Sequence, residues 1–202
     1  MSAVVEQSRT RLRARLKEQP APPPWRPPTA RDLEPGRPVL AWDATLTNCA
    51  WALMAAGGDG VVIYEKGTIR PRTALTGYRG TWDKATQLRD AISAVTDRVR
   101  PADVVLEAPS VGGGYRVESS LMAGFMVWSM DPGNCHDVSA TRVSAVMLGD
   151  ARVRSDERKK RIRAAVIELV PEAAGRGYNE HIRDSIATGV TWLWDLKAQA
   201  AP

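Results

Sequence analysis

The sequence predicts an α/β domain built on a mixed five-stranded sheet with helices on both faces. Strand-like segments follow one another at 39–47, 50–55 and 61–71, and the turn sequence GGDG separates the last two. This order is typical of an antiparallel meander closed by a Gly-rich hairpin. Helical and strand-like patterns then alternate toward the C-terminus, which indicates a partly parallel sheet covered by helices.

The first 37 residues differ in composition from the rest of the chain. A basic segment, RTRLRARLK, leads into a proline-rich stretch that ends at Pro38. Because proline fixes φ and lacks a backbone donor, we expect an extended arm here and neither a helix nor a central strand. The predicted organisation is a basic and proline-rich arm, 1–37, which is flexible or folds on a partner, and one globular domain, 38–202.

Length and composition restrict the classes of protein. A chain of 202 residues with 44% hydrophobic content is typical of one domain with a real core. The net charge of +5 favours an anionic partner such as nucleic acid without requiring one. Cys49 and Cys135 lack metal-site spacing and are too few for a disulfide framework, so we expect a reducing, cytoplasmic location. No stretch has the length and hydropathy of a membrane span, and we expect no membrane partner.

After the meander, the pattern changes to helix and strand in turn. Apolar residues recur at helical spacing over 82–99, and the apolar run ADVVLEAPS over 102–110 then predicts a buried parallel strand that ends on Glu107. A second helix is expected at 117–130, and a fifth strand followed by a turn within 134–148. The last two helices are expected from an N-cap at Ser155 to Pro171, and over 180–196.

Two acids occupy unusual places in this pattern. Asp43 interrupts the apolar strand VLAWDATLT, and Glu107 ends the strand VVLE. Each could have an ordinary structural role, Asp43 in forming a turn and Glu107 as a surface acid at a strand end. Neighbouring strands of an open α/β sheet nevertheless place such residues at the same crevice. A buried carboxylate also needs a compensating partner, and a metal ion is one.

The final helix supplies further candidate ligands. Its apolar stripe falls on one side of the helix: Ile182, Ile186, Gly189, Val190 and Leu193. The opposite side carries polar residues: His181, Asp184, Ser185 and Thr188. His181 and Asp184 are spaced i, i+3 and can reach one point, and Glu180 is a rival ligand. Such a polar face is often only solvated, but together with two strand acids it favours a metal site.

Carboxylate and imidazole ligands of this kind suit hard divalent cations. Mg²⁺ or Mn²⁺ bound by Asp43, Glu107, His181 and Asp184 fits the residue types, and two ions in one site can activate water and stabilise the leaving oxygen of a phosphodiester. No organic cofactor is expected. The sequence therefore predicts a two-metal phosphodiesterase site.

The order of elements resembles the ribonuclease H-like superfamily and, within it, the RuvC-type Holliday junction resolvases, including phage-type members. WDATLTNCAWAL is similar to that family's first strand, VVLEAPS to its glutamate strand, and HIRDSIATGV to its last catalytic helix. The resemblance covers residues 39–196. It implies that Asp43, Glu107 and Asp184 are the metal-binding carboxylates and that His181 takes the remaining position on the last helix.

The resemblance also implies a DNA-binding surface and a dimer. It marks the basic segment GDARVRSDERKKRIR as the part that contacts DNA near the cut, with these phosphate-binding candidates: Arg154, Arg158, Lys159, Lys160 and Arg163. Lys159 and Lys160 are also candidates to stabilise the reacting phosphate. The family's wedge residue after the strand glutamate is replaced by SVGGG, so Tyr115 is the nearest aromatic candidate for a base contact. Paired nicks imply a C2 homodimer, and the Met-rich helix 117–130 is the candidate interface.

The predicted function is metal-dependent resolution of four-way DNA junctions in recombination, repair or replication. A nuclease of the same fold that acts on flaps, other branched DNA or RNA–DNA hybrids would use the same residues. A non-catalytic nucleic-acid-binding module would need the basic surface but neither Asp43 nor Glu107. Sugar kinases and actin-like ATPases share the superfold, but they need a second domain for which 202 residues leave no room.

Overall fold

The computed structural model describes residues 25–58, 60–108, 115–153 and 155–200. Its sheet has the order β3-β2-β1-β4-β5. The strands are β1 (Val39–Asp43), β2 (Cys49–Ala56), β3 (Val61–Ile69), β4 (Asp103–Ala108) and β5 (Cys135–Ser139). The helices are η1 (Ala30–Asp32), α2 (Gly77–Val99), α3 (Tyr115–Met130), α4 (Ala140–Leu148), α5 (Ser155–Leu169), η2 (Pro171–Ala174) and α6 (Glu180–Ala200). None of the described helices combines the length and the hydropathy needed to cross a membrane.

The predicted mixed sheet is confirmed. Strands β1, β2 and β3 form an antiparallel meander, whose hairpin is closed by a hydrogen bond from the Gly57 amide to the Gly60 carbonyl at 2.8 Å. Strands β4 and β5 extend the sheet on the other side of β1, both in parallel pairing. As a result β1 is the central strand, with a neighbour on each side.

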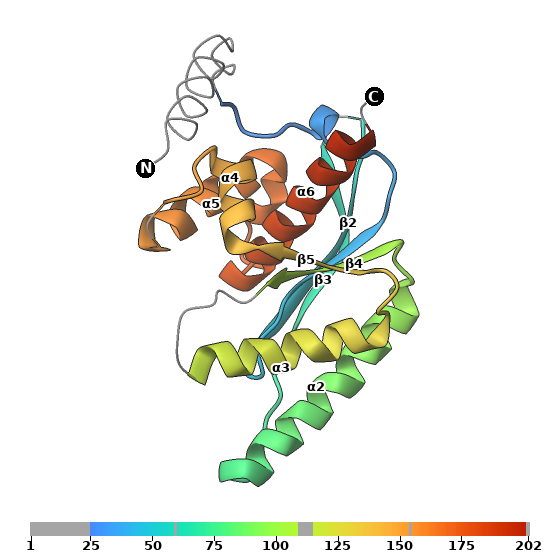
Figure 1. Cartoon of the computed structure of the whole chain (residues 1–202), viewed down its shortest axis with the longest axis vertical. Coiled ribbons are helices and arrows are strands. Elements are labelled where there is room, and N and C mark those ends of the chain that lie inside the picture. The colour runs from blue at the N-terminus through green and yellow to red at the C-terminus, as the bar shows by residue number, and fades with distance from the viewer. Residues whose placement is uncertain (1–24, 59, 109–114, 154, 201–202) are drawn as a thin grey trace, which may run out of the picture.

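Helices cover both faces of this sheet, as Figure 1 shows. Helices α2 and α3 lie on one face, and α4, α5 and α6 lie on the other. Strand β1 contributes to both cores by simple alternation, since Val39 and Ala41 face α6 while Leu40 and Trp42 face α2 and α3. The continuous apolar run of β1 therefore reflects burial on both sides.

Two local expectations are wrong. The segment after β5 forms the helix α4 and not merely a turn, because the Ser139 hydroxyl caps it by accepting from the Arg142 amide at 3.1 Å, and Gly149 ends it at φ 68°. Strand β1 also stops at Asp43 and does not continue to residue 47. A turn follows it, in which the Thr45 hydroxyl donates to the Asn48 carbonyl at 2.8 Å. Asp43 is thus at the end of its strand.

Residues 25–37, the described part of the predicted arm, pack against the domain. Leu33 is 1% exposed and belongs to the core beneath α6, and the Glu34 amide donates to the Leu193 carbonyl at 3.0 Å. The indole of Trp25 reaches the Val146 carbonyl on α4 at 3.4 Å. Residues 1–24 lie outside the described part of the chain.

Helix α6 lies between the sheet and the helices α4 and α5, so its polar side is buried as well. Ser185 and Thr188 are fully buried, and their hydroxyls donate to the carbonyls of His181 and Asp184 one turn earlier. The side predicted to carry the ligands is therefore accessible to solvent only near the start of the helix, where His181 and Asp184 lie. Gly189 allows the close approach to the sheet, because a Cβ at this position would lie 3.1 Å from that of Ala41.

Candidate active site

The two strand acids lie side by side at one edge of the sheet. Strands β1 and β4 are parallel with Trp42 opposite Leu106, so Asp43 and Glu107 hold equivalent positions one residue further along. Both side chains are only partly accessible to solvent. The turn after Asp43 is held to α3 by a hydrogen bond from the Leu46 amide to the Ser119 hydroxyl at 3.0 Å. The sheet thus brings together two carboxylates from sequence-distant segments.

Helix α6 adds the third and fourth groups. Oxygen or nitrogen atoms of Asp43, His181 and Asp184 all lie within 4.8 Å of one another, and His181 Nδ1 is 2.6 Å from Asp43 Oδ2. Asn179 fixes the start of the helix, since its side chain accepts from the Ile182 amide at 2.9 Å. The predicted i, i+3 pair therefore meets the acid of β1.

Burial and neighbouring negative charges disfavour the ionised forms of Asp184 and Glu107. Burial, with the charges of Asp43 and Glu107, raises the pKa of Asp184 to about 7. Burial also raises the pKa of Glu107, against the opposing effect of the Arg158 guanidinium. A group of acids whose ionised forms are this costly has the electrostatic character of a cation-binding site.

His181 is held as a partner of Asp43. The hydrogen bond to Asp43 raises the pKa of His181, against the effect of burial, and so favours the imidazolium. Only the neutral imidazole binds a metal, so a role as ligand requires loss of that proton. The geometry is compatible with either role predicted for His181, metal ligand or base for water.

Glu107 lies outside the three-residue cluster and forms an ion pair with Arg158. Arg158, which is also a predicted DNA contact, places Nη2 3.2 Å from Glu107 Oε1. Its Nε donates to the hydroxyl of Ser144, a 2% exposed residue of α4, at 2.9 Å. Arg158 therefore positions Glu107 from behind, and Ser144 is a supporting residue that no pattern in the sequence marks.

The remaining basic candidates line a cavity beside the acids. The cavity has a volume of about 290 Å³ and is lined by Lys159, Lys160, Arg163, Glu180, Arg183 and Asp184. Lys159 forms an ion pair with Glu180 across it, which raises the pKa of the lysine and lowers that of the acid. Glu180 is therefore turned to Lys159 and lies outside the three-residue cluster.

One cavity residue was missed and two predicted ones lie outside the described structure. Arg183 was not a candidate, although its place directly before Asp184 in HIRD on a ligand-bearing helix is a sequence signal. Arg154 and the side chain of Tyr115 lie outside the described residues. The predicted role of each in DNA binding stays a prediction.

The donor set fits a divalent cation. Carboxylate oxygens are preferred by Mg²⁺ and Mn²⁺, and a histidine nitrogen beside them is acceptable to Mn²⁺ in particular. Burial, together with the charges of Asp43 and Glu107, raises the pKa of Asp184 to about 7, and a bound divalent cation would offset both effects. Asp43, Asp184 and a deprotonated His181 would hold the ion, with Glu107 completing the site from β4.

Comparison with solved structures finds the same fold in Holliday junction resolvases. Thermus thermophilus RuvC in complex with a Holliday junction matches with a TM-score of 0.62 at 16% identity, over 82% of this chain and 98% of that one. The yeast mitochondrial Holliday junction resolvase Ydc2 matches with a TM-score of 0.55 at 12% identity, over 83% and 84%. Fowlpox virus Holliday junction resolvase matches with a TM-score of 0.50 at 10% identity, over 79% and 99%.

Comparison with protein-family models finds no match, and comparison with curated protein sequences finds none either. The likeness is therefore one of structure at low sequence identity, and it extends over almost the whole of the bacterial enzyme. The chain has the α/β fold of the RuvC-type resolvases, as the order of its strands, helices and acids predicted.

Proposed function

We propose that this chain is a divalent-metal-dependent endonuclease that resolves four-way DNA junctions by paired nicks. The observation that carries the proposal is the meeting of Asp43, His181 and Asp184 within 4.8 Å, beside a cavity rich in lysine and arginine. Acids that bind metal, flanked by cations that bind phosphate, are what hydrolysis of a DNA phosphodiester requires. The fold that the chain shares with Holliday junction resolvases supports the junction as the substrate.

Each residue then has a defined task. Asp43, Glu107 and Asp184 would hold two Mg²⁺ or Mn²⁺ ions, which when bound supply an activated water and stabilise the leaving oxygen. His181, hydrogen-bonded to Asp43, would act in its neutral form, either as a ligand of the ion or as the base that orients the attacking water and accepts its proton. Lys159 forms an ion pair with Glu180 and lines the same cavity as Asp184. From there Lys159, together with Lys160 in the same cavity wall, would offset negative charge on the phosphate.

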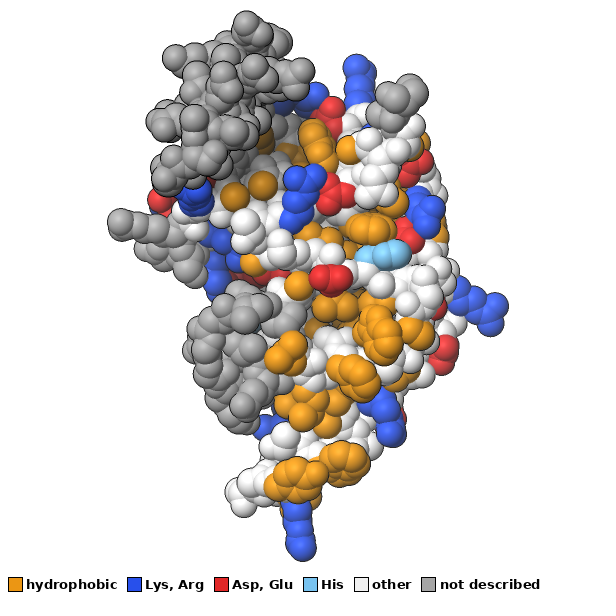
Figure 2. Space-filling view, in the orientation of Figure 1, with side chains coloured by type: hydrophobic (Ala, Val, Ile, Leu, Met, Phe, Trp, Pro, Cys, Tyr) orange, Lys and Arg blue, Asp and Glu red, His pale blue; other side chains and the backbone are white. Residues whose placement is uncertain are grey.

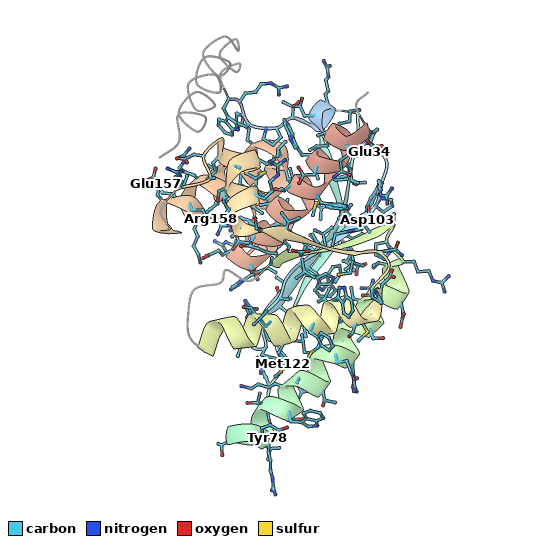
Figure 3. All side chains as sticks on the ribbon, in the orientation of Figure 1. Glu34, Tyr78, Asp103, Met122, Glu157 and Arg158 are labelled. Carbon is cyan, nitrogen blue, oxygen red and sulfur yellow. The ribbon has the colours of Figure 1, made fainter. Side chains whose placement is uncertain are left out.

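Two symmetric nicks require two sites, so we propose a C2 homodimer that joins at α2 and α3. These helices expose an apolar surface, visible in Figure 2 in the region of α2 and α3. Its large side chains are between 42% and 81% exposed: Tyr78, Trp82, Leu121, Met122, Phe125 and Trp128. Figure 3 places Tyr78 and Met122 on this side of the sheet, away from Arg158. A surface of this kind is rarely left uncovered in a monomer.

Cleavage of labelled substrates tests the function. The chain and its Asp43→Asn variant are incubated with a four-way junction, a flap, an RNA–DNA hybrid and a linear duplex, with Mg²⁺, with Mn²⁺ or with a chelator. We expect paired nicks in the junction with either metal, and a loss of roughly a thousandfold or more in the variant. Absence of cleavage of every substrate with both metals would refute the nuclease, and leave the non-catalytic binding module.

Equal cleavage of flaps and junctions would refute only the junction preference, and would favour the broader nuclease of the same fold.

Light scattering tests the dimer, with Phe125→Glu expected to give a monomer and exposed Tyr64→Glu on β3 expected to remain dimeric. A wild-type chain that is monomeric at all concentrations would refute the proposed interface.

A further inference from the structure

The cavity beside the metal cluster has a wall that the proposed metal site does not use. Lys160, Arg163 and Arg183 contribute to this wall. Arg183 is only 8% exposed, and its Nε donates to the Ala173 carbonyl at 2.9 Å. Burial and this hydrogen bond fix the side chain, and Arg183 is one of the residues that line the cavity. A cation held in this way is preorganised for an incoming anion.

The acids of the cavity leave this wall with excess positive charge. Glu180 is engaged by Lys159, and Asp184 belongs to the metal cluster. Among the ion pairs of the described residues, none includes Arg163 or Arg183. Arg163 and Arg183 line the same cavity, so an anion bound there would be attracted to both guanidinium groups.

We propose that this cavity is a phosphate-binding subsite in which Arg163 and Arg183 hold a backbone phosphate of the DNA strand next to the one that is cut. The inference rests on the proposed nuclease function and adds a fixed contact to it. Because Asp184 belongs to both the cavity wall and the metal cluster, a phosphate held here is a close neighbour of the reacting one. A volume of about 290 Å³ accommodates a phosphate group with water. Guanidinium forks would fix its orientation, and so fix which bond reaches the metal.

Neutral linkages in the DNA test this contact directly. Single methylphosphonate linkages are placed one at a time on either side of the cut in a four-way junction, and binding is measured by fluorescence anisotropy in an Asp43→Asn background that does not cleave. We expect one linkage beside the cut to weaken binding about tenfold. Arg163→Gln, an exposed substitution that does not threaten the fold, should weaken binding of the unmodified junction about tenfold and reduce the salt slope by about one.

The decisive result is that the loss of binding caused by the neutral linkage and the loss caused by Arg163→Gln do not multiply when the two changes are combined. With Arg163→Gln, the critical linkage should cost clearly less than it does with Arg163 present, because one of the two guanidinium contacts is already absent. Arg183→Lys, at an unchanged melting temperature, should likewise weaken binding of the unmodified junction and reduce the cost of the critical linkage. The control is Arg31→Gln, which removes the same charge from an exposed residue near the opposite end of α6 and should change binding by less than about twofold. Losses that multiply at every linkage would overturn the subsite.

A second arm separates a DNA phosphate from a free one. Inorganic phosphate is added to the Asp43→Asn protein and to its Arg163→Gln derivative, and the melting temperature is measured. Stabilisation that needs Arg163, with no sensitive linkage in the junction, would mean that the cavity takes free phosphate and would overturn the DNA contact. If one linkage is sensitive but the chain with Asp43 restored cuts no substrate, the subsite is supported and the nuclease function is refuted. If the chain cuts the junction but no linkage is sensitive, the nuclease function is supported and the subsite is refuted.

Discussion

Removal of the charge on Asp184 should stabilise the metal-free protein while it abolishes metal binding. The pKa of this buried acid is raised to about 7, from about 4 in an unfolded chain, so the folded state binds the proton more tightly. Three pH units correspond to about 4 kcal/mol, and this is the cost of keeping Asp184 ionised in the folded state above pH 7. The metal-free protein should therefore lose stability as the pH rises from about 4 to about 7, and no further above.

The test is denaturant unfolding of the wild type and of Asp184→Asn, in chelator, at pH 5 and pH 8. We expect the variant to be more stable by about 2–4 kcal/mol at pH 8 and by about 1 kcal/mol at pH 5, where the wild-type carboxyl is mostly protonated. Mg²⁺ should then stabilise the wild type far more than the variant. Asp97→Asn, an exposed acid on α2, is the control and should show no such difference.

A variant less stable than the wild type at pH 8, or a difference that is the same at both pH values, would refute the reasoning. Either result would mean that Asp184 is stabilised by partners in the folded state and is not strained by its neighbours.

Three further substitutions test how the fold positions the site. Gly189→Ala places a Cβ 3.1 Å from that of Ala41, so we expect unfolding to become easier by about 1–3 kcal/mol and cleavage to slow. Arg37→Met removes the bidentate partner of Asp103, which is 1% exposed. We expect the free energy of unfolding to fall by about 2 kcal/mol near neutral pH. The difference from the wild type should disappear as the pH falls through the lowered pKa of Asp103. Denaturant unfolding over a range of pH measures the loss and its pH dependence. Gly149→Ala, at φ 68°, should cost about 1–2 kcal/mol and free the N-terminal segment, whose indole lies against this glycine, for proteolysis.

The sequence was most informative where periodicity and burial agree. Strand β1 is apolar on both faces because it is central, and the hairpin between β2 and β3 follows from its glycines. The acids Asp43 and Glu107 were identifiable because a carboxylate directly after a buried run needs a partner that offsets the cost of its burial. Helix α4 was missed although its signals, Ser139 as the cap and Gly149 as the stop, are present in the sequence. Its apolar residues also fit a strand, and a short apolar run does not distinguish the two.

The sequence did not predict which neighbour each basic side chain of α5 contacts. Arg158, Lys159 and Arg163 lie in one basic run of α5, yet the first turns to Glu107, the second to Glu180, and the third lines the cavity. A helix separates consecutive residues by about 100°, so each meets a different neighbour that is supplied by a distant segment. Arg183 was overlooked for the same reason, since its fixing partner is a carbonyl of η2.

The sequence by itself determined the succession of strands and helices along the chain, the meander, the two strand acids Asp43 and Glu107, and the i, i+3 pair His181 and Asp184, because these depend on local spacing and on the cost of burying charge. Only the tertiary structure decided that the pair meets Asp43, that Arg158 supports Glu107 and that Arg183 faces a cavity. These contacts join residues far apart in the chain. Their geometry depends on how closely α6 packs on β1 and on which turn of α5 faces the sheet edge, and both are properties of the assembled core.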